Sequence, residues 1–360
     1  MLICPADDLT PAELSELSAV TRRFGLDFQT AARVSGGFSD AGVYRIEVLG
    51  QQPLAVRRTP TNTAADASRL RALHHLLRHV SQQGVTEVPV PLTVAADSVL
   101  PPVLTTETIV ERPSGWWHVE PWLPGKACEG HRLSALQIDS ALALLHRFHT
   151  AAADFAARQS ADSWFSLGWN ISPTVTRRLD LVERLAAVDL RRLQRAVAAD
   201  NEAAFAVPAA EFCRLLECAL PRLLARLRSL ARQQFALQPV IRDLWSAHIL
   251  FTADRVTGLI DLTAASTDHV AVDLVRLQRS WFAADSTRIR SLISCWQRLR
   301  PISAAEYNLL SVLDESSVFL SPCTWLQRRY LQHQTLATCR PHVVARFRSL
   351  VKVAADFEPL

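Results

Sequence analysis

Lysine is nearly absent from this sequence. Of its 39 basic residues only two are lysine, Lys126 and Lys352, and the rest are arginine. Any cationic contact to a phosphate group upstream of residue 126 must therefore come from an arginine, which keeps the charge but adds a wider, bidentate fork. The net charge of +4 is mild. It neither requires a nucleic-acid partner nor excludes a phosphate-bearing ligand, and we predict no nucleic-acid binding.

Paired cysteines and long apolar runs are also missing. The seven cysteines are scattered and form no CxxC motif, which argues against a zinc knuckle and against a disulfide framework. No stretch of about 18 uninterrupted apolar residues occurs, and the first residues lack a basic segment followed by an apolar core. We therefore predict a cytoplasmic protein with no membrane partner. Its oligomeric state cannot be read from the sequence.

Glycine is rare in the second half, where only Gly258 follows Gly168. A length of 360 residues suits two domains, at about 100–200 residues each. Between residues 30 and 125, short runs rich in β-branched and aromatic residues are separated by turn-forming residues, which predicts an antiparallel sheet. One amphipathic helix is expected within it, over 64–80. The strands are expected near 43–48, 54–56 and 116–120.

Helical spacing of apolar residues dominates from Ser134 onward, and this serine is a candidate helix cap. Further helices are predicted over 174–199, 209–233, 271–300 and 303–357, with breaks at Pro208, Pro301 and Pro341. Residues 239–265 differ, because apolar runs there alternate with turn signals at Asp254 and Gly258. We interpret this segment as a buried hairpin.

The ends of this hairpin carry the strongest chemical signal. Asp243 opens a polar loop, His248 follows five positions later, and Asp261 comes after the second apolar run. Because a hairpin brings its two ends together, these three side chains are expected to converge. Phosphotransferases use such a set: one aspartate receives the proton of the attacking hydroxyl, and the other two residues hold a metal ion against a triphosphate.

This segment resembles the catalytic region of the aminoglycoside phosphotransferase and choline kinase-like superfamily, whose fold is that of protein kinases. The usual pattern there is H-G-D or H-R-D, four residues, asparagine, and later I-D-F or I-D-W. Arg242-Asp243 and Ile260-Asp261 match it, whereas Ile241 replaces the histidine and His248 replaces the asparagine.

Upstream segments resemble further parts of the same superfamily, in the same order. A turn containing Gly36, Gly37 and Ser39 resembles the loop over the nucleotide phosphates, where glycine lets backbone amides approach closely. Arg57 takes the place of the strand lysine that binds the phosphates. Residues 121–125, Pro-Trp-Leu-Pro-Gly, resemble the hinge between the lobes, and Leu142-Ala-Leu-Leu-His146 resembles the first helix of the large lobe.

The resemblance implies an α+β, protein kinase-like fold of two lobes. A small antiparallel-sheet lobe with one helix would span residues 1–121, and a mainly helical lobe carrying the catalytic hairpin would span 122–360. It implies an ATP-dependent phosphotransferase that acts on a hydroxyl of a small molecule. Asp243 would be catalytic, and the adenine would contact backbone around Glu120 and Trp122. His248 and Asp261 would bind Mg²⁺, or the softer Mn²⁺.

Several alternatives stay open at this stage. Magnesium prefers oxygen ligands, so His248 is either a ligand or a structural residue. The helix over 64–80 offers no glutamate to pair with Arg57, which favours a second hypothesis, a catalytically impaired nucleotide-binding or scaffold protein. A protein kinase is disfavoured because no D-F-G or A-P-E segment follows Asp261. Asp273, in a D-L-x-x-L sequence, is predicted to cap or anchor a helix.

The acceptor molecule is not identified by the sequence. The helices expected to build its pocket are rich in arginine, which disfavours a polycationic drug. Arginines at 177, 178, 184, 191, 192 and 195 recur on one helix face. We interpret them as a solvated face, and an acidic substrate is the alternative.

Overall fold

A computed structural model describes residues 2–3, 9–35, 42–60, 63–95, 106–160, 163–332 and 341–359. The chain divides into two compact units. Unit 1 comprises residues 1–128, 133–165 and 247–265, and unit 2 comprises residues 129–132, 166–246 and 266–360. Each unit is therefore built from segments that are far apart in the sequence.

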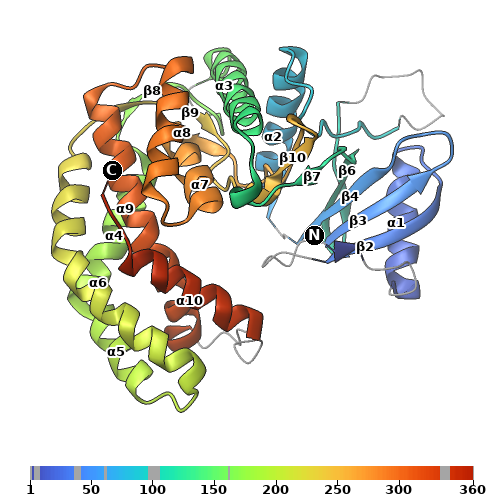
Figure 1. Cartoon of the computed structure of the whole chain (residues 1–360). Coiled ribbons are helices and arrows are strands. Elements are labelled where there is room, and N and C mark those ends of the chain that lie inside the picture. The colour runs from blue at the N-terminus through green and yellow to red at the C-terminus, as the bar shows by residue number, and fades with distance from the viewer. Residues whose placement is uncertain are drawn as a thin grey trace. The chain divides into compact units, whose positions relative to one another are not determined.

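An antiparallel sheet forms the first part of unit 1 (Figure 1). Its strand order in the described residues is β1-β2-β3-β4-β6-β5. The strands are β1 (Leu2–Ile3), β2 (Phe28–Ser35), β3 (Gly42–Val48), β4 (Leu54–Thr59), β5 (Val110–Arg112) and β6 (Gly115–Pro121). Alternate residues of β3 are buried, as expected for a sheet with one covered face. The three strands predicted from β-branched and aromatic runs are confirmed as β3, β4 and β6.

Helix α1 (Pro11–Arg23) covers part of this sheet. Leu17 and Val20 of the helix are fully buried and belong to the same apolar cluster as Ile46 and Val56 of the strands. The helix begins with a capping box between Thr10 and Glu13. Figure 1 shows α1 beside β2 and β3.

Two long helices and a small sheet complete unit 1. Helix α2 (Ala64–Gln82) follows β4 and packs against α3 (Ala135–Ala157), which is capped by Ser134 as predicted. Strands β7 (Lys126–Ala127), β10 (Ile249–Thr252) and β11 (Arg255–Leu259) form the second sheet, in the order β11-β10-β7. The predicted hairpin is confirmed as β10 and β11, but its bounds are narrower than 239–265, because residues 239–240 belong to a strand of a third sheet. Its turn is at 253–254, and Gly258 lies within β11 opposite Leu250.

Unit 2 is mainly helical around a three-stranded sheet of order β12-β9-β8. Its strands are β8 (Gly168–Asn170), β9 (Phe235–Val240) and β12 (Ser266–Asp268). Its helices are α4 (Pro173–Arg184), α5 (Leu190–Ala198), α6 (Ala203–Leu230), α7 (Ala271–Phe282), α8 (Ser286–Leu299), α9 (Ala304–Leu326) and α10 (Pro341–Ala355). Short helical turns are η2 (Gly130–Arg132), η3 (Leu185–Asp189), η4 (Ser246–His248) and η5 (Gln327–Leu331).

Three helix predictions need correction. The helix expected over 174–199 is interrupted by the π-helical turn η3, and the one expected over 271–300 divides at Ala283, whose φ of 47° cannot continue a helix. The break expected at Pro208 is wrong, because α6 already begins at Ala203. Pro208 is buried on the same face of α6 as Phe205 and Phe212, and burial of this face outweighs the loss of one backbone hydrogen bond.

The core of unit 2 contains buried charges that are paired. Asp314 and Glu315 of α9 are fully buried. Asp314 accepts hydrogen bonds from Arg279 and Gln278, and Glu315 accepts them from Arg222 and Arg226. This pairing explains why α9 tolerates two acids in its interior, since an unpaired buried charge would cost several kcal/mol, on the order of 3–5.

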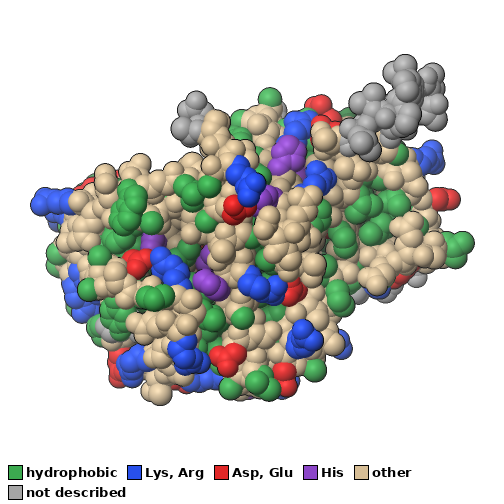
Figure 2. Space-filling view, turned by 90° about the horizontal axis from the view of Figure 1, so that it is seen from above, with side chains coloured by type: hydrophobic (Ala, Val, Ile, Leu, Met, Phe, Trp, Pro, Cys, Tyr) green, Lys and Arg blue, Asp and Glu red, His purple; other side chains and the backbone are tan. Residues whose placement is uncertain are grey.

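Charges of both signs are mixed on the face shown in Figure 2, where basic side chains stand among acidic ones. This differs from the single-sign stripe typical of a nucleic-acid-binding face. Among the described residues, no helix combines the length and apolar character needed to cross a membrane.

Candidate functional site

The hairpin β10–β11 brings together two of the three residues predicted to converge. The N–H group of Ile260 donates to the carbonyl of His248, which extends the ladder beyond the two strands. As a result, Nε2 of His248 lies 3.5 Å from Oδ2 of Asp261. Asp261 has a φ of 60°, a left-handed conformation that is uncommon outside glycine and that often marks functional positions.

Arg57 contacts the same aspartate. Its Nη2 donates to Oδ1 of Asp261 at 2.8 Å, and its Nη1 donates to Oε1 of Glu120 at 3.3 Å. The side chain of Arg57 is 14% exposed, that of Glu120 is 8% exposed and that of Asp261 is 41% exposed. The arginine is thus held between a buried acid and a more accessible one.

Strand register explains the pairing of Arg57 with Glu120. In the β4–β6 ladder, Arg57 is opposite His118 and Ala55 is opposite Glu120. Because side chains two residues apart in a strand point to the same face, Arg57, His118 and Glu120 share one face of the sheet. Nε2 of His118 lies 3.4 Å from Oε2 of Glu120, which fixes the carboxylate from its other side.

The charges in this cluster stabilise one another. Burial alone would raise the pKa of Glu120, but the positive charge of Arg57 and the hydrogen bond from His118 outweigh it and lower the pKa below its ordinary value. Burial likewise opposes the ionised form of Asp261, and Arg57 and His248 lower its pKa. The pKa of Arg57 is raised, because the two acids outweigh its desolvation. Both carboxylates are therefore ionised at neutral pH.

Besides Asp261, Arg57 has an acid partner from strand β6, and none from helix α2. At the position facing the strands, α2 carries His74, whose ring centroid lies 4.7 Å from that of His118. Burial and the neighbouring positive charges hold the pKa of His74 well below its usual range, so it is neutral. The sequence correctly indicates that α2 lacks an acid here. It does not reveal that Glu120 supplies one, because this depends on the pairing of β4 with β6.

Asp243 lies in unit 2, with neighbours of its own. Its Oδ1 accepts a hydrogen bond from Nε1 of Trp245 at 2.7 Å and a close one from Nη2 of Arg276. The guanidinium of Arg276 also lies over the indole of Trp245, at 4.5 Å from the ring centroid. The side chain of Asp243 is 45% exposed. It is thus oriented by two donors but still accessible.

Asp273 anchors the loop that carries Asp243. Its fully buried carboxylate accepts hydrogen bonds from the N–H groups of Ile241, at 2.9 Å, and Arg242, at 2.6 Å. Arg242 has a φ of 67°, so this strained turn is held by the aspartate. Asp273 was predicted to cap or anchor a helix. Its carboxylate instead anchors the loop before Asp243, and the start of α7 has no side-chain cap. Arg276 was not singled out by the sequence, although its spacing of three from Asp273 places both on one helix face.

The other residues predicted to contact the nucleotide are Gly36, Gly37, Ser39 and Trp122. Gly36, Gly37 and Ser39 lie outside the described residues. The N–H group of Trp122 donates to the carbonyl of Pro53 at 3.0 Å. That amide therefore already has a protein partner.

The donors near Asp261 suit a cation only in part. Within the described ranges, no group of three or more His, Cys, Asp and Glu side chains could hold a metal ion by itself. Mg²⁺ commonly binds through one or two carboxylates, with phosphates and water completing its shell. The carboxylate of Asp261 fits this role, whereas the imidazole of His248 is a softer donor than Mg²⁺ prefers.

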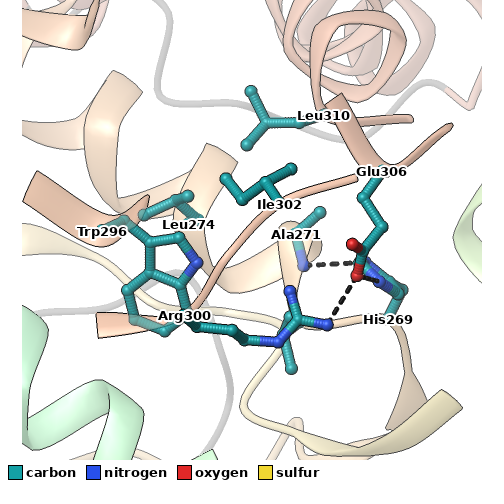
Figure 3. Close-up of a pocket in the computed structure, with 9 residues that line it drawn as sticks. His269, Ala271, Leu274, Trp296, Arg300, Ile302, Glu306 and Leu310 are labelled. Carbon is teal, nitrogen blue, oxygen red and sulfur yellow. Dashed lines mark hydrogen bonds and ion pairs between the residues drawn. The ribbon is translucent and has the colours of Figure 1, made fainter. Parts of the chain in front are cut away.

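A separate pocket in unit 2 has a structural explanation. It is lined by residues of α7, α8 and α9 and of the loops beside them (Figure 3). His269 and Arg300 both contact Oε1 of Glu306, at 3.1 and 2.5 Å. Ala271 donates its N–H group to Nδ1 of His269. Because these polar groups satisfy one another, the pocket holds the start of α9 in place.

Comparison with known proteins identifies the family. The model of the "Phosphotransferase enzyme family" matches residues 30–301. The chain belongs to this family. The chain matches a homoserine kinase of Janthinobacterium with 22% identity, over 96% of this chain and 95% of that protein. A homoserine kinase of Rhodopseudomonas palustris is 38% identical over 76 residues, which are 20% of this chain and only 23% of that protein's length.

Solved structures support the fold. The chain resembles spectinomycin phosphotransferase in complex with ADP and spectinomycin, with a TM-score of 0.66, 13% identity and coverage of 97% of this chain and 98% of that one. It also resembles amicoumacin kinase in complex with AMP-PNP and Ca²⁺, with a TM-score of 0.62, 12% identity and coverage of 94% and 92%. The family match confirms the predicted superfamily, and the solved structures confirm its kinase-like α+β fold.

Proposed function

We propose that the protein transfers the γ-phosphate of ATP to a hydroxyl group of a small molecule. The observation that supports this most is the meeting of Arg57 and Asp261, which are 204 positions apart in the sequence. A strand cation and an acid at the end of the hairpin are the pair that a phosphotransferase needs for its nucleotide phosphates and their cation. The family match covers both residues.

Each residue has a distinct role in this proposal. Asp243 accepts the proton of the acceptor hydroxyl, and Trp245 and Arg276 orient its carboxylate. Arg57 binds phosphate oxygens, and Asp261 binds the cation with His248 beside it. Mg²⁺, when bound, neutralises negative charge on the phosphates. Gly36, Gly37 and Ser39 would cover the phosphates, and backbone near Glu120 and Trp122 would contact the adenine.

The first acceptor to test is L-homoserine. A relative that is matched over nearly its whole length is named as a homoserine kinase, but the identity of 22% is too low to transfer a substrate by itself. We propose an assay of ADP formation with purified protein, Mg²⁺, ATP and a panel of hydroxylated metabolites. The panel includes L-homoserine, choline, a sugar and an aminoglycoside. The predicted cytoplasmic location is consistent with such substrates.

Asp243→Ala tests the assignment of the base. Loss of a general base lowers turnover by about a hundred- to ten-thousandfold. Asp180→Ala, which changes an exposed aspartate of α4, is the control and is expected to retain wild-type turnover. Equal turnover of Asp243→Ala and wild type would remove Asp243 from the mechanism.

One observation favours the second hypothesis, a nucleotide-binding or scaffold protein without catalysis. Arg57 already has two acidic partners, and the Trp122 amide is bonded to Pro53, so groups expected to bind nucleotide are engaged within the protein. Calorimetry with Mg²⁺ and ATP separates the two functions. Tight binding without turnover of any acceptor supports the scaffold, and turnover excludes it.

A further inference from the structure

Arg178 differs from the other arginines of its surface. Five arginines at 177, 184, 191, 192 and 195 are exposed, as predicted for a solvated face, whereas Arg178 is half-buried. Its guanidinium turns toward α9, where it donates to the carbonyl of Leu313 and to the hydroxyls of Ser316, at 2.6 Å, and Ser317, at 2.9 Å. Arg178 therefore lies inside unit 2 and is not part of the solvated face.

All three of these partners are neutral. The hydroxyl of Ser316 donates to the carbonyl of Val312, and that of Ser317 donates to the carbonyl of Leu313. Each serine thus uses its proton within α9 and offers a lone pair to the guanidinium. The arrangement fixes the position of Arg178 but does not balance its charge.

Nearby acids are committed to other donors. Within the described part of the chain, no carboxylate lies within ion-pairing distance of Arg178. Asp314 is paired with Arg279 and Gln278. Asp268 accepts hydrogen bonds from the hydroxyls of Ser172 and Thr174. The positive charge of Arg178 is therefore only partly offset from a distance.

Arg276 adds a second positive charge. Burial and the charge of Arg276 are the main reasons why the pKa of Arg178 is lowered, to about 9, and Asp268 only partly opposes them. Arg276 in turn contacts Asp243, the proposed base. A guanidinium has more donors than the three that Arg178 uses, so donors remain for a ligand. Arg178, held on α9 by its three hydrogen bonds, is thus near enough to Arg276 for their charges to repel, and Arg276 contacts the proposed base.

We propose that Arg178 and Arg276 form an anion subsite for the acceptor and that they bind a carboxylate of the molecule whose hydroxyl is phosphorylated. This proposal rests on the proposed function. Arginine is suited to this role, because its planar fork matches the two oxygens of a carboxylate. A ligand carboxylate would add a direct ion pair to the partial compensation that Asp268 and Asp314 provide from a distance. The acceptor class is therefore a hydroxy acid or hydroxy amino acid, and a polycationic acceptor is disfavoured.

The experiment compares matched ligands that differ only in the carboxylate. Wild-type protein is titrated by calorimetry, with Mg²⁺ and AMP-PNP present, with L-homoserine, L-serine and D-glycerate and with the primary amide of each. We expect at least one acid to bind about ten- to a hundredfold more tightly than its amide, the range expected for losing hydrogen bonds between charged groups. Equal binding of every acid and its amide, or no binding of any acid, would overturn the subsite.

Variants assign the preference to Arg178. We expect Arg178→Gln to remove the difference between acid and amide, and Arg178→Lys to restore part of it. Arg184→Gln, which changes an exposed arginine of the same helix, is expected to keep the full difference. A merely structural role for Arg178 would weaken acid and amide alike. If the acid–amide difference persists in Arg178→Gln, the subsite is not at Arg178.

Turnover separates this proposal from the proposed function. If an acid binds through Arg178 but no ADP forms with ATP, the subsite stands and the phosphotransferase proposal fails. If ADP forms with an acceptor that lacks a carboxylate as readily as with its acid counterpart, phosphate transfer stands and the subsite fails.

Discussion

Arg57 and Asp261 form an ion pair in which Nη2 of the arginine lies 2.8 Å from Oδ1 of the acid. Under the proposed function, these two side chains have complementary ligands, since Arg57 binds phosphate oxygens and Asp261 binds the cation. Entry of a metal–nucleotide complex would thus replace the ion pair between Arg57 and Asp261 by two new ones. Arg57 would pair with a phosphate, and Asp261 would pair with the cation. Until then, the ion pair keeps both side chains charged and oriented.

Asp261→Asn removes the proposed cation ligand and preserves the size of the side chain. Mg²⁺ binds carboxylates far better than amides, so the variant is expected to lose the Mg²⁺-dependent part of ATP binding. The Kd for ATP in Mg²⁺ should rise at least about tenfold, which corresponds to about 1.4 kcal/mol. Calorimetry with ATP in the presence of Mg²⁺ or of a chelator measures both values.

Asp254→Asn is the matched control for Asp261→Asn, because Asp254 is an exposed aspartate in the turn of the same hairpin. It is expected to bind ATP as the wild type does at either Mg²⁺ concentration. If Asp261→Asn retains the full Mg²⁺ dependence, the cation is held elsewhere.

Glu120→Gln tests whether the acid of β6 positions Arg57. Burial raises the pKa of Glu120, but the charge of Arg57 outweighs this effect, and the pKa is lowered from its ordinary value of 4.5. The ionised carboxylate therefore stabilises the fold above pH 4.5. This contribution is lost as pH falls through the folded-state pKa. We expect the free energy of unfolding of the variant to be lower by about 1–3 kcal/mol at pH 7. We also expect it to fall less steeply with decreasing pH than that of the wild type. Urea unfolding between pH 3 and 7 measures this.

A positioning role for Glu120 also predicts a kinetic effect. Arg57 would keep only Asp261 as a partner, and we expect the KM for ATP to rise by about tenfold with a smaller change in kcat. Glu120→Asp is expected to recover part of the loss. An unchanged KM for ATP would limit Glu120 to a structural role.

Local signals account for the parts of the fold that the sequence predicted. The Ser134 cap, the apolar stripe of α2 and the alternating strands all depend on residues within one turn or one strand. The capping box of Thr10 and Glu13 was equally readable and marks α1, which the sequence interpretation did not include. Local chemistry is thus enough for most elements.

Distant pairings account for what was missed. Glu120 meets Arg57 only because β4 and β6 pair in a particular register, across 63 positions of sequence. Arg178 separates from its exposed neighbours because α4 packs on α9, which no periodicity of α4 alone reveals. The division between α7 and α8 at Ala283 has no glycine or proline to mark it. Tertiary contacts decide each of these cases.

Asp273→Asn tests the anchor of the loop that carries Asp243. The amide keeps one oxygen acceptor but presents an NH₂ group to the N–H of Ile241 or Arg242, and either contact is then repulsive. We expect a loss of about 2–4 kcal/mol in the free energy of unfolding, because the hydrogen bonds are buried and charge-assisted. Turnover should fall in protein that remains folded, since the loop also carries Asp243. Asp180→Asn, exposed on α4, should change neither quantity.

Glu306→Gln tests whether Glu306 stabilises unit 2 without taking part in the activity. The hydrogen bond from His269 holds the pKa of Glu306 far below its ordinary value. Partial burial acts in the opposite direction, but the N–H group of Ser303 and Arg300 lower the pKa further. Replacing the carboxylate by an amide weakens these contacts, and we expect a loss of about 1–3 kcal/mol in the free energy of unfolding.

The kinetic parameters of Glu306→Gln should match those of the wild type at temperatures well below its Tm, because the pocket satisfies its own polar groups (Figure 3). Scanning calorimetry and ADP formation measure the two quantities on the same preparation. A variant of unchanged Tm, or one with an altered KM for acceptor at 25 °C, would show that this pocket does more than hold the start of α9.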